Sequence, residues 1–262
     1  MKPQQNIIKR LRTADMLLLL VIAGGVYARM STIPEPWVRG HNAWGGAVYG
    51  GIARNYIKFG YGETMLGPVA NSGVTTPDKF EFYYHHPPLL IWLLSLNYRI
   101  LGIHEWSARA LPLFFSLLSM GVLYAFVRRH FAPAVARTAL IFFAVMPIET
   151  FYGMHVEVYG PLAGFFSILT VTSYLNLLQT HSKKDFALCV TGILLGCMTS
   201  WFACLAVLPI LIHHHWACVR QDKSEFWQLW SLAAASKSQC DTRICWNTWK
   251  PGAGTAATTA LF

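Results

Sequence analysis

Two long uncharged runs limit what this chain can fold into: residues 158–180 and residues 186–212 contain no Asp, Glu, Lys or Arg. A run of about 18 or more such apolar residues is typical of a transmembrane helix, because a helix satisfies its own backbone in lipid. Only 13% of the residues are charged, against roughly a quarter in soluble domains. The sequence therefore predicts an all-α transmembrane protein with about five or six membrane spans.

Composition also excludes one class of protein and argues against another. An aromatic content of 14% is too high for a disordered chain, which cannot expose that much apolar surface to water. The net charge of +9 fits basic cytoplasmic loops and contact with membrane lipids. We therefore expect membrane lipids as partners and no nucleic acid.

Basic residues set the expected orientation. Residues 1–13 carry Lys2, Lys9, Arg10 and Arg12, which places them in the cytoplasm by the positive-inside rule. Residues 14–31 form the first span, in which Asp15 and Arg29 are each placed to snorkel to an interface. We expect a multi-pass protein of a bacterial inner membrane or the endoplasmic reticulum, with a cytoplasmic N-terminus.

Residues 32–109 are expected to form a long outer loop that contains interfacial helices. One helical piece is expected at residues 47–59. Leu89–Ile103 is apolar, but it is short for a span and contains Arg99, which favours a helix lying at the membrane surface. If this segment crossed, either the N-terminus or the basic turn at residues 128–137 would lie on the wrong side.

Residues 110–235 are expected to form the transmembrane bundle. Residues 186–212 fit either one long tilted helix or two short helices broken near Thr199–Trp201, and Arg220 with Lys223 favours two passes. Residues 236–262 lack periodicity and end in a Gly-, Ala- and Thr-rich stretch. They are predicted to be a low-complexity, aberrant tail, to which we assign no function.

A series of short motifs follows in a fixed order along the chain. They are Ile52-Ala53-Arg54-Asn55 with Phe59-Gly60-Tyr61, His85-His86-Pro87-Pro88-Leu89, Leu101-Gly102 with Glu105-Trp106-Ser107-Ala108-Arg109, Arg128-Arg129-His130-Phe131, and Glu157 ahead of Pro161. In order and spacing, they resemble the N-terminal part of the polytopic glycosyltransferases of GT-C type. These are the protein mannosyltransferases and aminoarabinose transferases, which use lipid-linked sugars. The resemblance covers roughly residues 14–215.

The resemblance implies transfer of a mannose-like sugar from a polyprenyl-phosphate donor to a protein or lipid acceptor at the outer or lumenal face. A donor with a lipid tail has to react at the membrane surface, so the catalytic groups belong on the outer loops. The leaving phosphate needs cationic or hydrogen-bonding groups, and the acceptor needs a carboxylate that removes its proton or binds a metal ion.

Site residues follow from the same resemblance. Glu157 stands where the family has an acidic residue in its second outer loop, and it either acts as a base or binds a divalent metal ion, the one cofactor expected. The alternative is an interfacial Glu that faces water. His85 and His86 are expected to contact the donor phosphate, or else to form a polar turn ahead of a proline pair. Arg54 is expected to pair with the phosphate, or else to lie on a solvated helix face.

One departure from the family is clear. The family has an acidic residue just ahead of the Ile-Ala-Arg helix, whereas this chain has none between Glu35 and Glu63. His41 is the nearest titratable residue and could assist as a general base; the alternative is a structural histidine beside Trp44.

A second histidine group is expected to have no catalytic role. His213-His214-His215 suits a basic cytoplasmic cap, because consecutive helical positions point in different directions and cannot all ligate one ion.

The sequence is compatible with two other functions. One is a truncated, non-catalytic member of the same family, because its enzymes continue past about six spans. The other is a small transporter. A transporter would carry polar residues in mid-span and internal repeats. Residues 158–180 hold only Ser, Thr, Tyr, Asn and Gln among their polar groups, and no repeat is found, which argues against a transporter.

Overall fold

The computed structural model describes residues 16, 19–31, 33, 36–37 and 40–220. Within these ranges the chain is helical, and its only β-bridge is an isolated one between Val69 and Phe82. The all-α fold expected from the sequence is confirmed. The predicted cytoplasmic segment 1–13 and the tail 236–262 lie outside the described residues.

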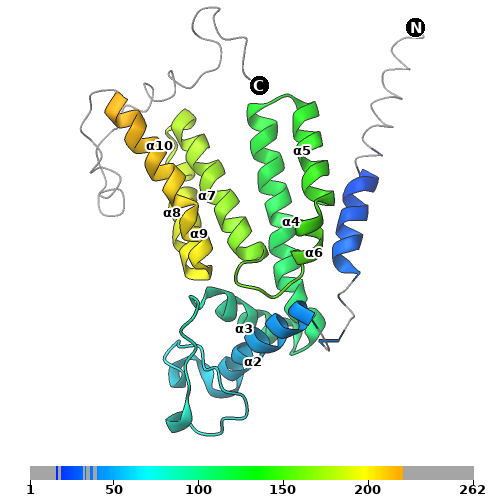
Figure 1. Ribbon diagram of the computed structural model, residues 1–262, viewed down its shortest axis with the longest axis vertical. Helices are drawn as coiled ribbons and strands as arrows, with labels where there is room; N and C mark the ends of the chain where they lie inside the picture. Colours follow the sequence, from blue (N-terminus) through cyan, green and yellow to red (C-terminus); the bar gives the residue numbers. More distant parts are fainter. Residues whose placement is uncertain (1–15, 17–18, 32, 34–35, 38–39, 221–262) are drawn as a thin grey trace, which may run out of the picture.

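Long helices run side by side as a bundle, and a second helical layer lies across one end of it (Figure 1). The bundle holds helix Leu19–Met30, α4 (Glu105–His130), α5 (Pro133–Val145), α7 (Pro161–Thr180), α8 (Lys183–Thr199) and α10 (Val207–Arg220). The end layer holds α2 (Gly40–Glu63) and α3 (Leu89–Leu101). Short helices α6 (Pro147–Tyr152) and α9 (Trp201–Leu205) lie between longer ones, and a 3-10 turn, η1, covers Pro77–Lys79.

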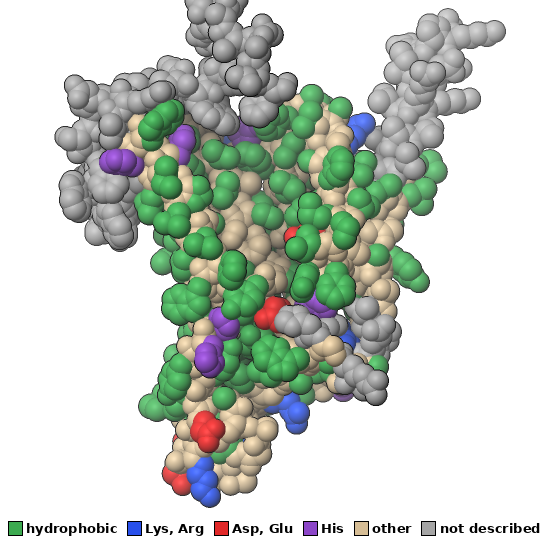
Figure 2. Space-filling model, in the orientation of Figure 1, with side chains coloured by type: hydrophobic (Ala, Val, Ile, Leu, Met, Phe, Trp, Pro, Cys, Tyr) green, Lys and Arg blue, Asp and Glu red, His purple; other side chains and the backbone are tan. Residues whose placement is uncertain are grey.

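Two of these helices, α4 and α7, are long and apolar enough to cross a membrane by length and composition. Helix Leu19–Met30, α5 and the segment Trp201–Trp216 are apolar but shorter. Hydrophobic side chains cover most of the visible face of the bundle, and charged side chains gather at the tip of the end layer (Figure 2).

Helix α3 is short for a membrane span, and its placement flat on the membrane surface stays a prediction. Its 13 residues span about 20 Å, less than the roughly 30 Å of hydrocarbon in a bilayer. It packs against α2 beyond the end of the bundle (Figure 1).

The apolar run at residues 186–212 is broken into separate helices at Ser200, as one of the two alternatives predicted. Ser200 is extended, with φ −159° and ψ 145°. Its N–H donates to the carbonyl of Gly196 at 3.0 Å, and its hydroxyl accepts from the N–H of Phe202 at 3.2 Å. One residue therefore ends α8 and caps the start of α9, a role that serine favours.

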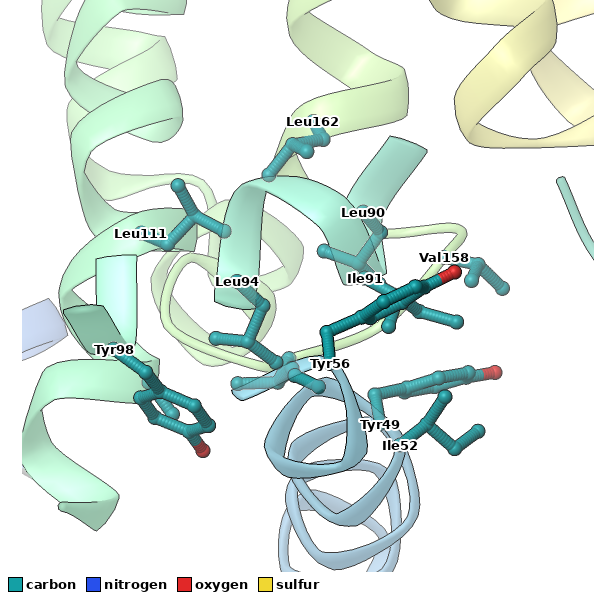
Figure 3. Packing of buried hydrophobic residues seen from close by; sticks show 13 residues of the cluster. Tyr49, Ile52, Tyr56, Leu90, Ile91, Leu94, Tyr98, Leu111, Val158 and Leu162 are labelled. Atoms are coloured by element: carbon teal, nitrogen blue, oxygen red, sulfur yellow. The ribbon is translucent and has the colours of Figure 1, made fainter. Parts of the chain in front are cut away.

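A single hydrophobic core joins the end layer to the bundle (Figure 3). Its buried members come from α2, α3, α4, α7 and the loop before α7: Tyr49, Ile52, Ala53, Tyr56, Leu90, Ile91, Leu94, Tyr98, Ala108, Leu111, Val156, Val158 and Leu162. Because residues from both layers share this core, the outer segments hold a fixed position against the bundle.

Arg29 does not snorkel to an interface, so that expectation was wrong. Its side chain is fully buried and donates to the carbonyls of Ala144 at 2.6 Å and Phe143 at 3.0 Å, in the last turn of α5. It also donates to the hydroxyl of Ser116 in α4 at 3.2 Å. Carbonyls at a helix C-terminus lack intrahelical partners and attract cations, so Arg29 ties three helices together. Asp15 lies outside the described residues.

The substitution Arg29→Met is expected to destabilise the bundle by about 2–4 kcal/mol, because it leaves buried carbonyls at the end of α5 without donors. Thermal unfolding of the detergent-solubilised protein measures this effect. Arg128→Met is the control, because Arg128 is exposed in the last turn of α4. Equal unfolding temperatures for the two variants would show that Arg29 does not hold the helices together.

Candidate functional site

The candidate site lies where the end layer meets the bundle. Four segments converge there: the first half of α2, the turn at residues 83–86, the loop at residues 153–160, and the start of α9. Histidine and acidic side chains reach the surface at this level of the molecule (Figure 2).

Glu157 lies in this loop and is buried, with 6% of its surface exposed. All residues from Met154 to Val158 are buried with it. Gly45 of α2 lies directly against the loop: a Cβ atom there would be 2.7 Å from the carbonyl oxygen of Val156 and 3.0 Å from Oε2 of Glu157. The alternative of a glutamate that faces water is therefore wrong.

Two tyrosine hydroxyls lie within electrostatic reach of the Glu157 carboxylate. Tyr49 of α2 and Tyr83 are 3.4 Å apart, oxygen to oxygen. Burial raises the pKa of both tyrosines, and the negative charge of Glu157 raises each pKa further. Both hydroxyls therefore stay protonated and can donate hydrogen bonds at this site.

His86 is held by the loop that carries Glu157. Its Nε2 lies 3.2 Å from the hydroxyl of Tyr159, and the two rings meet edge to face at 5.1 Å. Its Nδ1 is buried and has no hydrogen-bond partner among the described residues. Burial lowers the pKa of His86, and the neighbouring charge of His85 lowers it further. The ring is therefore held mainly neutral near pH 7.

His85 is exposed, and its backbone is fixed by α9. The indole N–H of Trp201 donates to the carbonyl of His85 at 3.0 Å. The ring of Phe202 also packs against that of Tyr159 at 4.9 Å. The break at Ser200 therefore brings two aromatic side chains of α9 to the candidate site.

The turn that carries both histidines is anchored on α2 by the Ile-Ala-Arg-Asn motif. Ile52 and Ala53 are buried in the core. The side-chain amide of Asn55 donates to the carbonyl of Val69 at 2.8 Å. The Val69 segment pairs with the chain just before the turn, where the N–H of Tyr83 donates to the carbonyl of Pro68 at 2.7 Å.

Arg54 is exposed and lies beside α3. Burial raises the pKa of Tyr98, the charge of Arg54 lowers it, and the charge of Glu105 raises it. The pKa values of Tyr49 and Tyr83 are instead raised by the charges of Glu157 and Tyr159. The structure thus brings Glu157 and His86 together through tyrosines and places Arg54 beside Tyr98. A role for Arg54 in phosphate binding stays a prediction.

The backbone of His41 belongs to the first turn of α2, but its side chain lies outside the described residues. Its role as a base, like its alternative role beside Trp44, stays a prediction.

The histidines at the end of α10 belong to the other end of the bundle (Figure 1). Nδ1 of His213 lies 2.8 Å from the hydroxyl of Tyr174 in α7. His214 is buried and His215 is exposed. The three side chains differ in burial and surroundings, which agrees with the expectation that they do not share one ion.

Metal ligands do not gather within the described part of the chain: no group of three or more His, Cys, Asp or Glu residues is placed to hold an ion there. The described residues therefore do not build a metal site unaided. The divalent ion assigned to Glu157 stays a prediction.

Sequence reasoning missed several residues of this site, namely Gly45, Tyr49, Tyr83 and Tyr159. The helix expected at residues 47–59 did not include Gly45; in the structure α2 begins at Gly40, and the one-turn spacing from Gly45 to Tyr49 places both on one face. No sequence pattern indicates that this face meets the loop at residues 153–160.

Comparison with known proteins agrees with this architecture. A curated relative, an uncharacterized protein of Aquifex aeolicus (strain VF5), is 28% identical over 140 residues, which are 53% of this chain and 25% of the relative. ArnT from Cupriavidus metallidurans in the apo state has a similar structure, with a TM-score of 0.62 over 84% of this chain and 38% of that one. At 18% identity, that likeness shows a shared membrane-protein fold.

The family comparison confirms the resemblance expected from the motifs. A family model described as dolichyl-phosphate-mannose-protein mannosyltransferase matches residues 85–235. These residues include the His85–His86 turn, Glu157, α7 and the Ser200 break. The chain is an integral membrane protein that belongs to the dolichyl-phosphate-mannose-protein mannosyltransferase family.

Proposed function

We propose that this protein transfers a mannose-like sugar from a polyprenyl-phosphate donor to a protein or lipid acceptor at the outer or lumenal membrane face. The observation that carries the proposal is the buried carboxylate of Glu157 beside the His85–His86 turn, at the end of an apolar bundle. A lipid tail can lie along the bundle while the sugar phosphate reaches the polar residues at its end. The chain spans 25% of its curated relative and 38% of ArnT, so the activity of the whole protein is part of the proposal.

In the proposed reaction, Glu157 accepts the proton of the acceptor's nucleophilic group as that group attacks the anomeric carbon. The bond between this carbon and the phosphate oxygen breaks, and the phosphate leaves with the bonding electrons. The configuration at the sugar is thereby inverted. Burial of Glu157 keeps water from competing with the acceptor for the carboxylate.

The histidines serve the leaving phosphate in this mechanism. His86 is oriented by Tyr159, and the exposed His85 ring lies next to it; each offers a ring N–H to phosphate oxygens, where negative charge develops. Arg54 adds a guanidinium at the same end of the molecule, and His41 assists as a second base from the first turn of α2. A divalent ion bound by Glu157 would neutralise phosphate charge.

The proposed orientation places the end layer outside and the N-terminus in the cytoplasm. With α3 lying flat, the chain crosses three times between the His85–His86 turn and the loop that joins α7 to α8. The basic pair Lys183-Lys184 then faces the cytoplasm, as the positive-inside rule requires.

Transfer of radiolabelled sugar from a polyprenyl-phosphate donor, measured in membranes, tests the mechanism. Glu157→Gln is expected to lose about a hundredfold or more of the activity, the scale of a lost acid–base group. Glu63→Gln is the matched control, because Glu63 is exposed at the end of α2, and it should retain activity. Equal activity in both variants would exclude Glu157 as the base. Inactivity of the unmodified chain would instead favour a non-catalytic family member.

A second variant tests the position of Glu157 without altering its chemistry. Gly45→Ala places a methyl group against Val156 and Glu157, and we expect a loss of at least about tenfold in kcat. Gly51→Ala is the matched control on the same helix, because a Cβ there meets nothing within 4 Å. If the two alanine variants were equally active, close approach of α2 would not be required.

Labelling with a membrane-impermeant maleimide tests the orientation, in a chain whose native cysteines are replaced by serine. Tyr84→Cys, at a position 80% exposed, is expected to react in intact cells. Lys184→Cys, exposed at the start of α8, should react only after permeabilisation. Reaction of both in intact cells would mean that α3 crosses the membrane, and the reverse pattern would invert the orientation.

A further inference from the structure

Two cysteines face each other across the break between α8 and α9. Cys197 lies in the last turn of α8, and Cys204 lies in α9, seven positions further along the chain. The thiol of Cys204 donates to Sγ of Cys197, with the two sulfur atoms 2.9 Å apart. Both are free thiols and half-buried, whereas Cys189 of the same helix is buried.

Ser200 is what brings the two thiols together. Its extended backbone turns the chain, and its two capping hydrogen bonds, to Gly196 and from Phe202, fix that turn. The sulfur atoms are thus held in contact by secondary structure. A covalent bond between them would need only a small further approach, since a disulfide bond is about 2.0 Å long.

This pair lies at the same end of the bundle as the candidate site. Between the two cysteines, Trp201 donates to the carbonyl of His85, and Phe202 packs on Tyr159, whose hydroxyl meets His86. Under the orientation proposed above, this end faces the periplasm or the lumen. Disulfides form and persist in those compartments, whereas cytosolic thiols are kept reduced.

We propose that Cys197 and Cys204 form a disulfide across the α8–α9 turn, on the oxidising side of the membrane. A thiolate of one cysteine attacks a small-molecule disulfide and releases one of its thiols, giving a mixed disulfide. The second cysteine, as thiolate, then attacks the protein sulfur and displaces the other thiol. In sum, the two protein thiols lose two protons and two electrons, and the small-molecule disulfide becomes two thiols.

The disulfide would fix the turn that carries Trp201 and Phe202. These two side chains hold the backbone of His85 and the ring of Tyr159, so the redox state of the pair bears directly on how firmly the histidine turn is seated. This inference rests on the proposed orientation for the oxidising environment and on the contact of the two thiols for the bond itself. The two parts can be tested separately.

The bond is tested on the purified, detergent-solubilised full chain, incubated with oxidised glutathione and then alkylated with a maleimide. Peptide mass spectrometry is expected to find Cys197 and Cys204 unalkylated and joined, with the linked peptides lighter by two hydrogens. Cys189→Ser should form the same bond, while Cys197→Ser and Cys204→Ser should not. Alkylation of both cysteines in most molecules, or a bond from either to another cysteine, would overturn the proposal.

The environment is tested in intact cells whose thiols are trapped with N-ethylmaleimide before lysis. The same linked peptide is expected there, and it should disappear when a reductant is added before trapping. A pair that joins in the purified protein but is fully reduced in cells would overturn the placement on the oxidising side. The labelling of Tyr84→Cys and Lys184→Cys decides the orientation independently. A failure of the disulfide proposal can therefore be told apart from a failure of the proposed orientation.

Discussion

The candidate site depends on the close approach of α2 to the buried loop between α6 and α7. Connecting loops usually run over a protein surface, where water satisfies their backbone groups. Here Met154 to Val158 are buried instead, with Val156 and Val158 in the core that joins both layers. Gly45 allows this approach, because a Cβ atom there would lie 2.7 Å from the carbonyl of Val156. The loop thus fixes Glu157 at the boundary between the layers.

The other end of this loop, at Gly153, contacts the buried Arg29 of helix Leu19–Met30. A Cβ at Gly153 would lie 3.1 Å from Cδ of Arg29, so loop and arginine are in contact. Arg29 also binds the end of α5 through Ala144, and α6 and the loop follow directly. A cation within the bundle is costly unless it is paired. The cost of burying Arg29 is offset by its hydrogen bonds to carbonyl groups of α5, which would otherwise lack donors. Helix Leu19–Met30 and α5 therefore stabilise each other.

Local signals in the sequence were enough to predict an all-α membrane protein, and to offer a break near Ser200 as one of two alternatives. Length, charge and apolar runs carry that information, because each depends on neighbouring residues. The surroundings of Arg29 could not be predicted in this way, since its partner Ala144 lies 115 positions away. The same holds for Tyr159, which lies 73 positions from His86. The motifs indicated Glu157 and His86 as site residues, but only packing shows which tyrosines join them.

The acid missing from the first outer loop changes what the site can do. The first turn of α2 contains no acidic residue, and Gly45 brings the helix backbone to within contact of Glu157. A second carboxylate at this point would lie beside a buried negative charge, and one of the two would tend to be protonated. Protonated hydroxyls of Tyr49 and Tyr83 lie within electrostatic reach of Glu157 instead. Two tyrosine hydroxyls, and no second carboxylate from the first turn of α2, therefore lie near Glu157. In the mechanism proposed here, Glu157 accordingly takes the role of principal base, and the phosphate depends on the histidine turn for its donors.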